Sequence, residues 1–270
     1  MTSIALTVAG SDSSGGAGIQ ADLKTFAALG VYGASVITAL TAQNTHGVAA
    51  IHNVPPDFIS AQLDAVFSDL DIGAVKVGML GRAAAVEAVA RGLSRHKAKK
   101  IVLDPVLAAS TGASLIARGG VDALRQLLIP RALIVTPNLP EAAALTGASA
   151  ARNEQEMEIQ AREILSLGPR YVLIKGGHGE GEESIDLLIG QGDVVRLSAK
   201  RIATKNTHGT GCTLSSAIAA GLTKGLDPVA AVQEAKAYVT AAIAAAVDMR
   251  IGRGHGPLNH FFAQAKWRAS

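Results

Sequence analysis

The segment with the richest chemistry in this sequence is 206–212, which runs directly into an alanine-rich stretch that predicts a helix. Small residues at a helix N-terminus leave backbone N–H groups unpaired, and such groups bind anions. Gly209, Thr210 and Gly211 therefore predict an anion hole for a transferring phosphoryl group. Cys212 would lie beside that group as a general base, and we expect the helix dipole to lower the pKa of its thiol. The alternative is that Cys212 is a small packing residue.

Four further polar residues end short apolar runs or follow them closely. Ligands of open α/β sheets collect at the C-terminal ends of the strands, so these positions favour a site. Asp104 and Glu141 are candidate Mg²⁺ residues, because magnesium keeps most of its waters and uses only one or two carboxylates. Lys175 is a candidate phosphate-binding cation, with a surface lysine as the alternative. Asn138 has a second interpretation as the cap of a helix beginning at Pro140.

A glycine-rich loop at 10–18 follows the first apolar run and suggests close approach of the backbone to a ligand. The loop lacks both the Gly-Lys-Ser/Thr ending of a P-loop and the spacing of a dinucleotide fingerprint. Asp22 is expected to accept hydrogen bonds from the polar edge of a ligand, and Gln43 can both donate and accept. Met79 would form a soft wall for a flat ring. Each residue also fits a structural role: Asp22 as a solvated carboxylate, Gln43 as an amide that stabilises its loop, and Met79 as a core side chain.

The elements that must position these residues are predicted by short runs of continuous apolar sequence. Such runs indicate strands buried on both faces, as in a parallel sheet covered by helices. The expected strands are 4–9, 34–40, 74–77, 101–103, 133–135 and 171–174. The expected helices are 18–29, 83–94, 121–128, 152–167, 212–223 and 228–247. A β-hairpin is expected from the runs 185–189 and 194–197.

No Pro/Ser-rich linker, charge block or repeat divides the sequence, so we expect a single domain over residues 1–270. The predicted fold class is α/β, with a mostly parallel central sheet flanked by helices and a small antiparallel edge. The uncharged stretch 25–56 is interrupted by Gly30 and Gly33, which favours a buried helix and strand over a membrane span. The start of the chain reads as a strand and not as a signal peptide, so a soluble cytoplasmic protein is expected.

The composition excludes several classes of function. The 25 Lys and Arg residues nearly balance 22 Asp and Glu residues, and aromatic residues make up 3%, which argues against nucleic-acid binding. Cys212 is the one cysteine, so neither an intramolecular disulfide nor a multi-cysteine zinc site is possible. A redox role is also disfavoured, because an oxidised Cys212 would have no resolving partner.

Several segments carry a family resemblance, in order, along almost the whole chain. They are 9–22, 41–45, 76–79, 104–106, 136–141, 175–178, 208–216 and 254–261. Together they resemble the bacterial hydroxymethylpyrimidine/phosphomethylpyrimidine kinases of the ribokinase-like superfamily. The Gly-Thr-Gly-Cys sequence is the most diagnostic part, since most ribokinase-like relatives carry Asp where this chain has Cys212.

The resemblance implies a ribokinase-like fold, a homodimer, ATP and Mg²⁺ as cofactors, and a small-molecule substrate. It implies phosphorylation of 4-amino-5-hydroxymethyl-2-methylpyrimidine and then of its monophosphate, in thiamin biosynthesis. The residues that would line the pyrimidine pocket are Gly10, Asp22, Gln43, Met79 and Val106.

By the same resemblance, Asp104 and Glu141 would organise Mg²⁺ and water. The residues implied at the nucleotide and its phosphates are Asn138, Lys175 and Lys236. The chain departs from the family pattern at Leu107, where Met is frequent, and at Ser110, where Lys or Thr is frequent. The change at Leu107 conserves volume, and no charged contact is expected at Ser110.

Two other functions remain open on the sequence. A pyridoxal kinase shares the fold and also phosphorylates a hydroxymethyl group on an aromatic ring, although Asp22 and Gln43 favour the aminopyrimidine. A nucleotide-binding module without catalysis is the alternative outside enzymes, and the presence of Cys212 and Lys175 argues against it.

Overall fold

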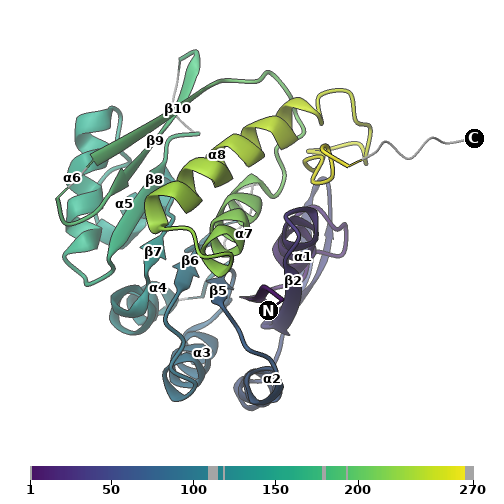
Figure 1. Cartoon of the computed structure of the whole chain (residues 1–270), viewed down its shortest axis with the longest axis vertical. Helices are drawn as coiled ribbons and strands as arrows, with labels where there is room; N and C mark the ends of the chain where they lie inside the picture. The colour runs from purple at the N-terminus through teal and green to yellow at the C-terminus, as the bar shows by residue number, and fades with distance from the viewer. Residues whose placement is uncertain (1, 109–114, 118, 178–180, 193, 265–270) are drawn as a thin grey trace, which may run out of the picture.

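The computed structural model describes residues 2–108, 115–117, 119–177, 181–192 and 194–264. An eight-stranded sheet forms its centre, with the strand order β10-β9-β8-β7-β6-β5-β1-β2 (Figure 1). In this sheet the strands β2, β1, β5, β6, β7 and β8 are each parallel to the next, whereas β9 pairs antiparallel with both β8 and β10. The expected α/β class, with a mostly parallel sheet and an antiparallel edge, is thereby confirmed.

The strands of this sheet are short, as their apolar runs predict. They are β1 (Ile4–Ala9), β2 (Tyr32–Ile37), β5 (Ala74–Val77), β6 (Ile101–Leu103), β7 (Ile134–Val135), β8 (Tyr171–Lys175), β9 (Glu183–Ile189) and β10 (Val194–Lys200). Two further strands, β3 (Ala39–Asn44) and β4 (Gly47–Asn53), pair with each other as a separate antiparallel sheet, here called the flap.

The helices fill the connections between strands. They are α1 (Gly18–Ala28), α2 (Pro56–Asp69), α3 (Ala83–Arg95), α4 (Gly120–Ala123), α5 (Leu139–Thr146), α6 (Glu154–Leu165), α7 (Thr210–Thr223) and α8 (Pro228–Ala244). The chain continues from α4 through η1 (Leu124–Leu128) and η2 (Ile129–Arg131). None of the helices within the described ranges is long and apolar enough to cross a membrane.

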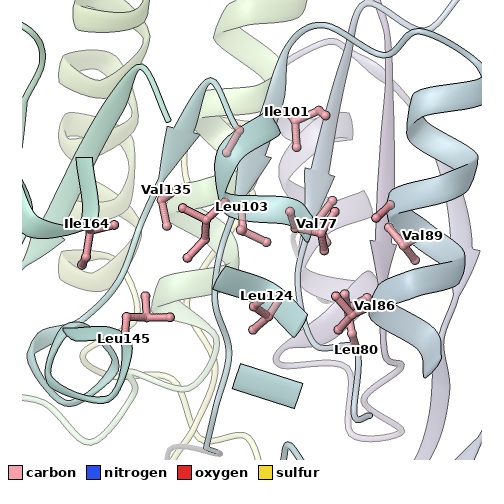
Figure 2. Packing of buried hydrophobic residues seen from close by; sticks show 14 of the residues in the cluster. Val77, Leu80, Val86, Val89, Ile101, Leu103, Leu124, Val135, Leu145 and Ile164 are labelled. Atoms are coloured by element: carbon pink, nitrogen blue, oxygen red, sulfur yellow. The ribbon is translucent and has the colours of Figure 1, made fainter. Parts of the chain in front are cut away.

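Side chains alternate between the two faces of the sheet and so feed two separate cores. Ile101 and Leu103 of β6 pack into one core with α3, while Val102 between them packs into the other with α7 and α8. Figure 2 shows the first core, in which Val77 of β5 lies between Leu103 of β6 and Val89 of α3. The second core lies beneath the paired helices α7 and α8 (Figure 1). Helices on both faces leave the strand ends as the open edge where a site can form.

The predicted strand 34–40 is wrong in its extent, because the chain leaves the sheet at Thr38. The Thr38 N–H donates to Ala9 O, and its buried hydroxyl donates to Met79 O at 2.7 Å. These contacts fix a corner, and β3 then begins a new direction at Ala39. The uncharged stretch 25–56 therefore contains the end of α1 and three strands, and Gln43 lies in a flap strand. The helix α2 was not predicted from the sequence.

Candidate active site

The carboxylates predicted for magnesium and the lysine predicted for phosphate lie together where β6 and β8 end and where α5 begins after β7. Lys175 Nζ is 2.8 Å from Asp104 Oδ1 and 3.8 Å from Glu141 Oε2. Asp104 is buried, and it also accepts a hydrogen bond from the Thr136 hydroxyl at 3.1 Å. The chain brings the three groups together because β6, β7 and β8 are neighbours in the sheet. We call Asp104, Glu141 and Lys175 the charged cluster.

Glu141 is both a helix-cap residue and a member of the charged cluster, so the two interpretations of this segment hold together. Asn138 Oδ1 accepts from the Glu141 N–H at 2.9 Å, and Glu141 Oε2 accepts from the Asn138 N–H at 2.8 Å. Burial raises the pKa of Glu141 to about 7, while Lys175 opposes the rise and Asp104 adds to it. Since the Asn138 side chain serves as the cap, its contact with a nucleotide stays a prediction.

The glycine-rich segment Gly209–Cys212, which consists of the N-cap and the first turn of α7, is here called the anion loop. Gly209 caps the helix with φ +83°, and a Cβ there would lie 1.9 Å from Gly16 O, so only glycine fits. The helix begins at Thr210, which is earlier than the sequence predicted. No acceptor for the N–H groups of Gly211 and Cys212 occurs within the described part of the chain. The loop therefore offers two donors to an anion.

The anion loop lies against the charged cluster. A Cβ added to Gly211 would be 3.2 Å from Lys175 Nζ and 3.6 Å from Asp104 Oδ2. Backbone donors, a lysine and two carboxylates thus share one small volume, although they come from four separate parts of the sequence. This is the arrangement that the transfer of a charged group requires.

The prediction of an acidic thiol at Cys212 is wrong. Burial raises the pKa of the Cys212 thiol to about 11; the charge of Lys76 lowers it, but Asp22 and Asp104 raise it further. The helix N-terminus favours a thiolate, but here desolvation and two nearby carboxylates outweigh it. Cys212 is therefore a neutral thiol at pH 7 in the protein without ligands.

Asp22 takes a different place from the one expected. Its carboxylate is fully buried, and Lys76 Nζ lies 2.8 Å from Oδ2 and 2.9 Å from Oδ1. The hydroxyls of Thr7 and Ser216 each donate to it at 2.6 Å. A carboxylate enclosed in this way does not line an open pocket, so we replace its expected contact with substrate by a supporting role. Burial alone would lower the pKa of Lys76, but Asp22 and the neighbouring Cys212 and Asp104 hold it above its ordinary value.

The other residues expected around a pyrimidine come together beside the flap. A Cβ on Gly10 would lie 3.0 Å from Met79 Sδ, so the glycine gives the methionine its room. Met79 forms a small apolar cluster with Ala39, and Val106 packs against that cluster. Gln43 is half-buried above the glycine-rich loop. Ser110 lies outside the described residues.

Lys236 does not touch the charged cluster. It reaches from α8 to Asp186 Oδ2 at 2.7 Å, and Asp186 Oδ1 accepts from the N–H of Gly176, next to Lys175. The phosphate contact of Lys236 stays a prediction, and its buried partner Asp186 was not predicted from the sequence. The signal was an acidic residue, Asp186, inside the otherwise apolar run 185–189 of β9.

A cavity of about 520 Å³ opens between the end of β10 and the anion loop. Its lining includes Lys200, Arg201, Thr204 and Thr207, and Thr207 O accepts from the Thr210 N–H of the anion loop. None of these residues was predicted from the sequence, although the adjacent Lys200 and Arg201 were a signal. The cavity is large enough for part of a nucleotide, and its lining ends at Thr207, two residues before Gly209.

This edge of the sheet carries two backbone N–H donors, a lysine and two carboxylates, which are the kinds of group that phosphoryl transfer uses. The described residues contain no group of three or more His, Cys, Asp or Glu side chains that could hold a metal. Two carboxylates suffice for a magnesium ion that keeps its waters. The fold and the site define a small-molecule kinase of the ribokinase-like class.

Comparisons with known proteins identify the family within this class. The family model described as phosphomethylpyrimidine kinase matches residues 12–259. A hydroxymethylpyrimidine/phosphomethylpyrimidine kinase of Rhizobium meliloti (strain 1021) is 58% identical over 261 residues, covering 97% of this chain and 98% of that relative. The chain belongs to the phosphomethylpyrimidine kinase family.

Two solved structures show the same fold. The pyridoxal kinase of Bacillus subtilis, described as an ADP complex, superposes with a TM-score of 0.91 at 35% identity, covering 98% of this chain and 100% of that chain. The phosphomethylpyrimidine kinase of Clostridium difficile 630 gives a TM-score of 0.79 at 44% identity, covering 89% of this chain and 99% of that chain. The ribokinase-like fold implied by the sequence resemblance is confirmed.

Proposed function

We propose that this protein uses ATP to phosphorylate 4-amino-5-hydroxymethyl-2-methylpyrimidine and then the resulting monophosphate, giving the pyrophosphate used in thiamin biosynthesis. The observation that carries the proposal is the close approach of the anion loop to the charged cluster, with Gly211 beside Lys175 and Asp104. The name of the Rhizobium meliloti relative, at 58% identity, supports the substrate class.

In this mechanism the backbone N–H groups of Gly211 and Cys212 hold the transferring group, and Lys175 neutralises its charge. Asp104 and Glu141 would hold Mg²⁺ through water, and the ion would supply further positive charge at the phosphates. The cavity beside Thr207 would take the nucleoside part of ATP. Gly10, Gln43, Met79 and Val106 remain the proposed surroundings of the pyrimidine ring.

Cys212 is proposed as the base for the attacking hydroxyl. Its thiol is neutral at pH 7 in the free protein, because burial and the charges of Asp22 and Asp104 raise its pKa. Once the charge of Asp104 is neutralised in the loaded site, that carboxylate no longer raises the thiol pKa, and Lys76 continues to lower it. Phosphoryl transfer passes through a loose transition state, so the substrate hydroxyl gives up its proton only late in the reaction, and Cys212 need not be ionised beforehand.

A second candidate is pyridoxal kinase activity, favoured by the TM-score of 0.91 to the Bacillus subtilis pyridoxal kinase. A coupled assay of ADP release, with the pyrimidine alcohol, its monophosphate and pyridoxal side by side, decides between them. We expect both pyrimidines to give kcat/KM well above pyridoxal. The highest kcat/KM with pyridoxal would overturn the pyrimidine assignment and leave the kinase class intact.

The activity is expected to fall as the pH drops through about 7, because Glu141 has a pKa of about 7 and must be ionised to hold magnesium-bound water. Higher Mg²⁺ concentration should shift this acid limb to lower pH, since the ion binds the carboxylate and not the carboxylic acid. A kcat/KM profile against pH at two Mg²⁺ concentrations checks this. An acid limb that is unchanged in Glu141→Gln would assign the titration to another group.

The raised pKa of Glu141 makes folding stability depend on pH in the opposite direction to activity. A buried carboxyl group with a raised pKa binds its proton more tightly in the folded state than in the unfolded state, where a Glu titrates near about 4.3. The stabilisation from this proton is fully present below the unfolded pKa and is lost as the pH rises through about 7. Glu141 therefore contributes least to the folding stability of the metal-free protein at the pH where the enzyme is most active.

We also propose a single kinase domain over residues 1–270 that acts as a homodimer in the cytoplasm. The dimer rests on the family resemblance, and light scattering at micromolar concentration would measure it. A monomeric mass would overturn the proposal.

A further inference from the structure

His208, the residue before the anion loop, connects four segments that are distant in the sequence. Its Nε2 lies 2.8 Å from Asp12 Oδ2 in the glycine-rich loop and 3.4 Å from the side-chain amide of Gln43 in the flap. Its backbone N–H donates to Gly256 O in the C-terminal segment. The ring is also packed closely, because a Cβ on Gly16 would come within 2.4 Å of His208 Cδ2. Both His208 and Asp12 are buried.

The proton between His208 and Asp12 belongs to the histidine. Burial raises the pKa of Asp12, but hydrogen bonds from His208, Ser14 and Ala17 outweigh it and hold the pKa well below its usual range. An ionised carboxylate only accepts, so His208 Nε2 carries the hydrogen and donates it. Nε2, the nitrogen nearest Gln43, therefore carries a hydrogen that it gives to Asp12, and it cannot accept one from the Gln43 amide.

The Gln43 amide lies between His208 and Thr41. In the structure, Gln43 Nε2 is 3.4 Å from His208 Nε2 and Gln43 Oε1 is 3.2 Å from Thr41 Oγ1, and a half-turn of the amide exchanges its oxygen and nitrogen. The Thr41 hydroxyl has one proton and donates it to Ser11 O at 2.8 Å, so toward Gln43 it is an acceptor. The one Nε2–H of His208 is donated to Asp12, so toward Gln43 this nitrogen can neither accept a hydrogen nor offer a second one. An amide nitrogen facing His208 would oppose that N–H and would leave the amide oxygen against the Thr41 oxygen, so the favoured orientation has the amide oxygen toward His208 and the amide nitrogen toward Thr41. The Gln43 backbone is fixed as well, since its N–H donates to Ser13 Oγ and its carbonyl accepts from that hydroxyl.

We propose that His208 is a positioning residue that sets substrate specificity, because with Asp12 it holds the Gln43 amide in one orientation. The held amide keeps one lone pair on Oε1 and one proton on Nε2 for a ligand. An acceptor beside a donor is complementary to the ring nitrogen and adjacent amino group of a 4-aminopyrimidine. This inference rests on the proposed function, in which Gln43 contacts the heterocycle.

The test is a double-variant cycle of His208→Leu and Gln43→Ala. Loss of a partner from a buried polar group typically costs a factor of about 5 to 150, so His208→Leu should raise KM for the pyrimidine by about that factor. KM for ATP should be unchanged, because His208 holds the flap side of the site. In the Gln43→Ala background, His208→Leu should raise KM for the pyrimidine no further. Additive effects, or equal rises in both KM values, would overturn the proposal.

Matched variants separate positioning from structural support. Gln places an amide nitrogen near the position of His Nε2, whereas Asn places one near Nδ1. We expect His208→Gln to keep a KM close to wild type and His208→Asn to behave like His208→Leu, even where all three lower the melting temperature. If His208→Leu does not fold, the Gln and Asn variants decide the point. Equal KM values for these two would overturn the proposal.

The cycle also distinguishes this proposal from the proposed function. If the wild-type enzyme phosphorylates pyridoxal and not the pyrimidine, the substrate assignment fails. The same four proteins are then measured with pyridoxal as substrate. Non-additive KM effects would still support His208 as the residue that positions Gln43, and additive effects would still overturn it.

Discussion

Replacing Cys212 with Ala is expected to lower kcat by about 10² to 10⁴, the usual value of general-base assistance. The affinity for ATP should stay near normal, because the backbone donors of Gly211 and Cys212 remain in place. The melting temperature should change little, since Ala is close in volume to Cys and the residue keeps some exposed surface although its thiol is desolvated. Steady-state kinetics and a thermal melt on the same sample measure both quantities. A variant with wild-type kcat and a lowered melting temperature would make Cys212 a packing residue.

Cys212→Asp is the matched control for this variant, because Asp stands at this position in most ribokinase-like relatives. We expect it to retain more activity than Cys212→Ala. Chemical modification adds an independent measurement. Because the thiol pKa is raised to about 11, alkylation of the free enzyme should be slow at pH 7 and should accelerate steadily up to that range. A reaction rate that levels off below pH 8 would contradict the raised pKa.

The second large effect is expected at the buried ion pair of Asp22 and Lys76. Asp22→Leu leaves a fully buried lysine without its partner, and breaking a buried pair in this way typically costs about 3–5 kcal/mol in the free energy of unfolding. Lys76→Met should cost less, because the hydroxyls of Thr7 and Ser216 still donate to Asp22. Urea unfolding measures both losses.

The double variant Asp22→Leu/Lys76→Met provides the control for this pair. It leaves no unpaired charge, so it should lose less stability than Asp22→Leu alone. Measuring kcat per folded molecule distinguishes an effect of each single variant on catalysis from its effect on stability. Lys76 lowers the thiol pKa of Cys212, so Lys76→Met should decrease kcat even in the folded fraction. Stability of Asp22→Leu close to wild type would contradict an ion pair buried without solvent.

The sequence predicted much of the sheet, because continuous apolar runs such as 101–103 identify strands buried on both faces. It also placed Asp104, Glu141 and Lys175 at strand ends, and parallel neighbours then bring such ends together. The flap was missed, since the run 34–40 contains no glycine or proline to mark the corner at Thr38. That corner depends on Met79 and Ala9, which are distant in the sequence.

The electrostatics of the site could not be predicted from local sequence. The helix N-terminus around Cys212 is visible in the sequence and favours a thiolate. The groups that decide the pKa come from α1, β5 and the end of β6, as Asp22, Lys76 and Asp104. The same limit applies to His208, whose partners Asp12 and Gln43 are brought near only by the folded chain.

The close packing of Gly16 against Gly209 and His208 has a consequence for when the site forms during synthesis of the chain. Only glycine fits at position 209, because a Cβ there would collide with Gly16 O. Only glycine fits at position 16, because a Cβ there would collide with the ring of His208. The glycine-rich loop is made near the start of synthesis, yet its counterpart emerges from the ribosome after three-quarters of the 270 residues. Contacts between such distant segments form late, because a long loop must close before they contribute. We therefore expect a nascent chain to carry an incomplete catalytic loop until the last helices are made, so that phosphoryl transfer begins only with the finished protein.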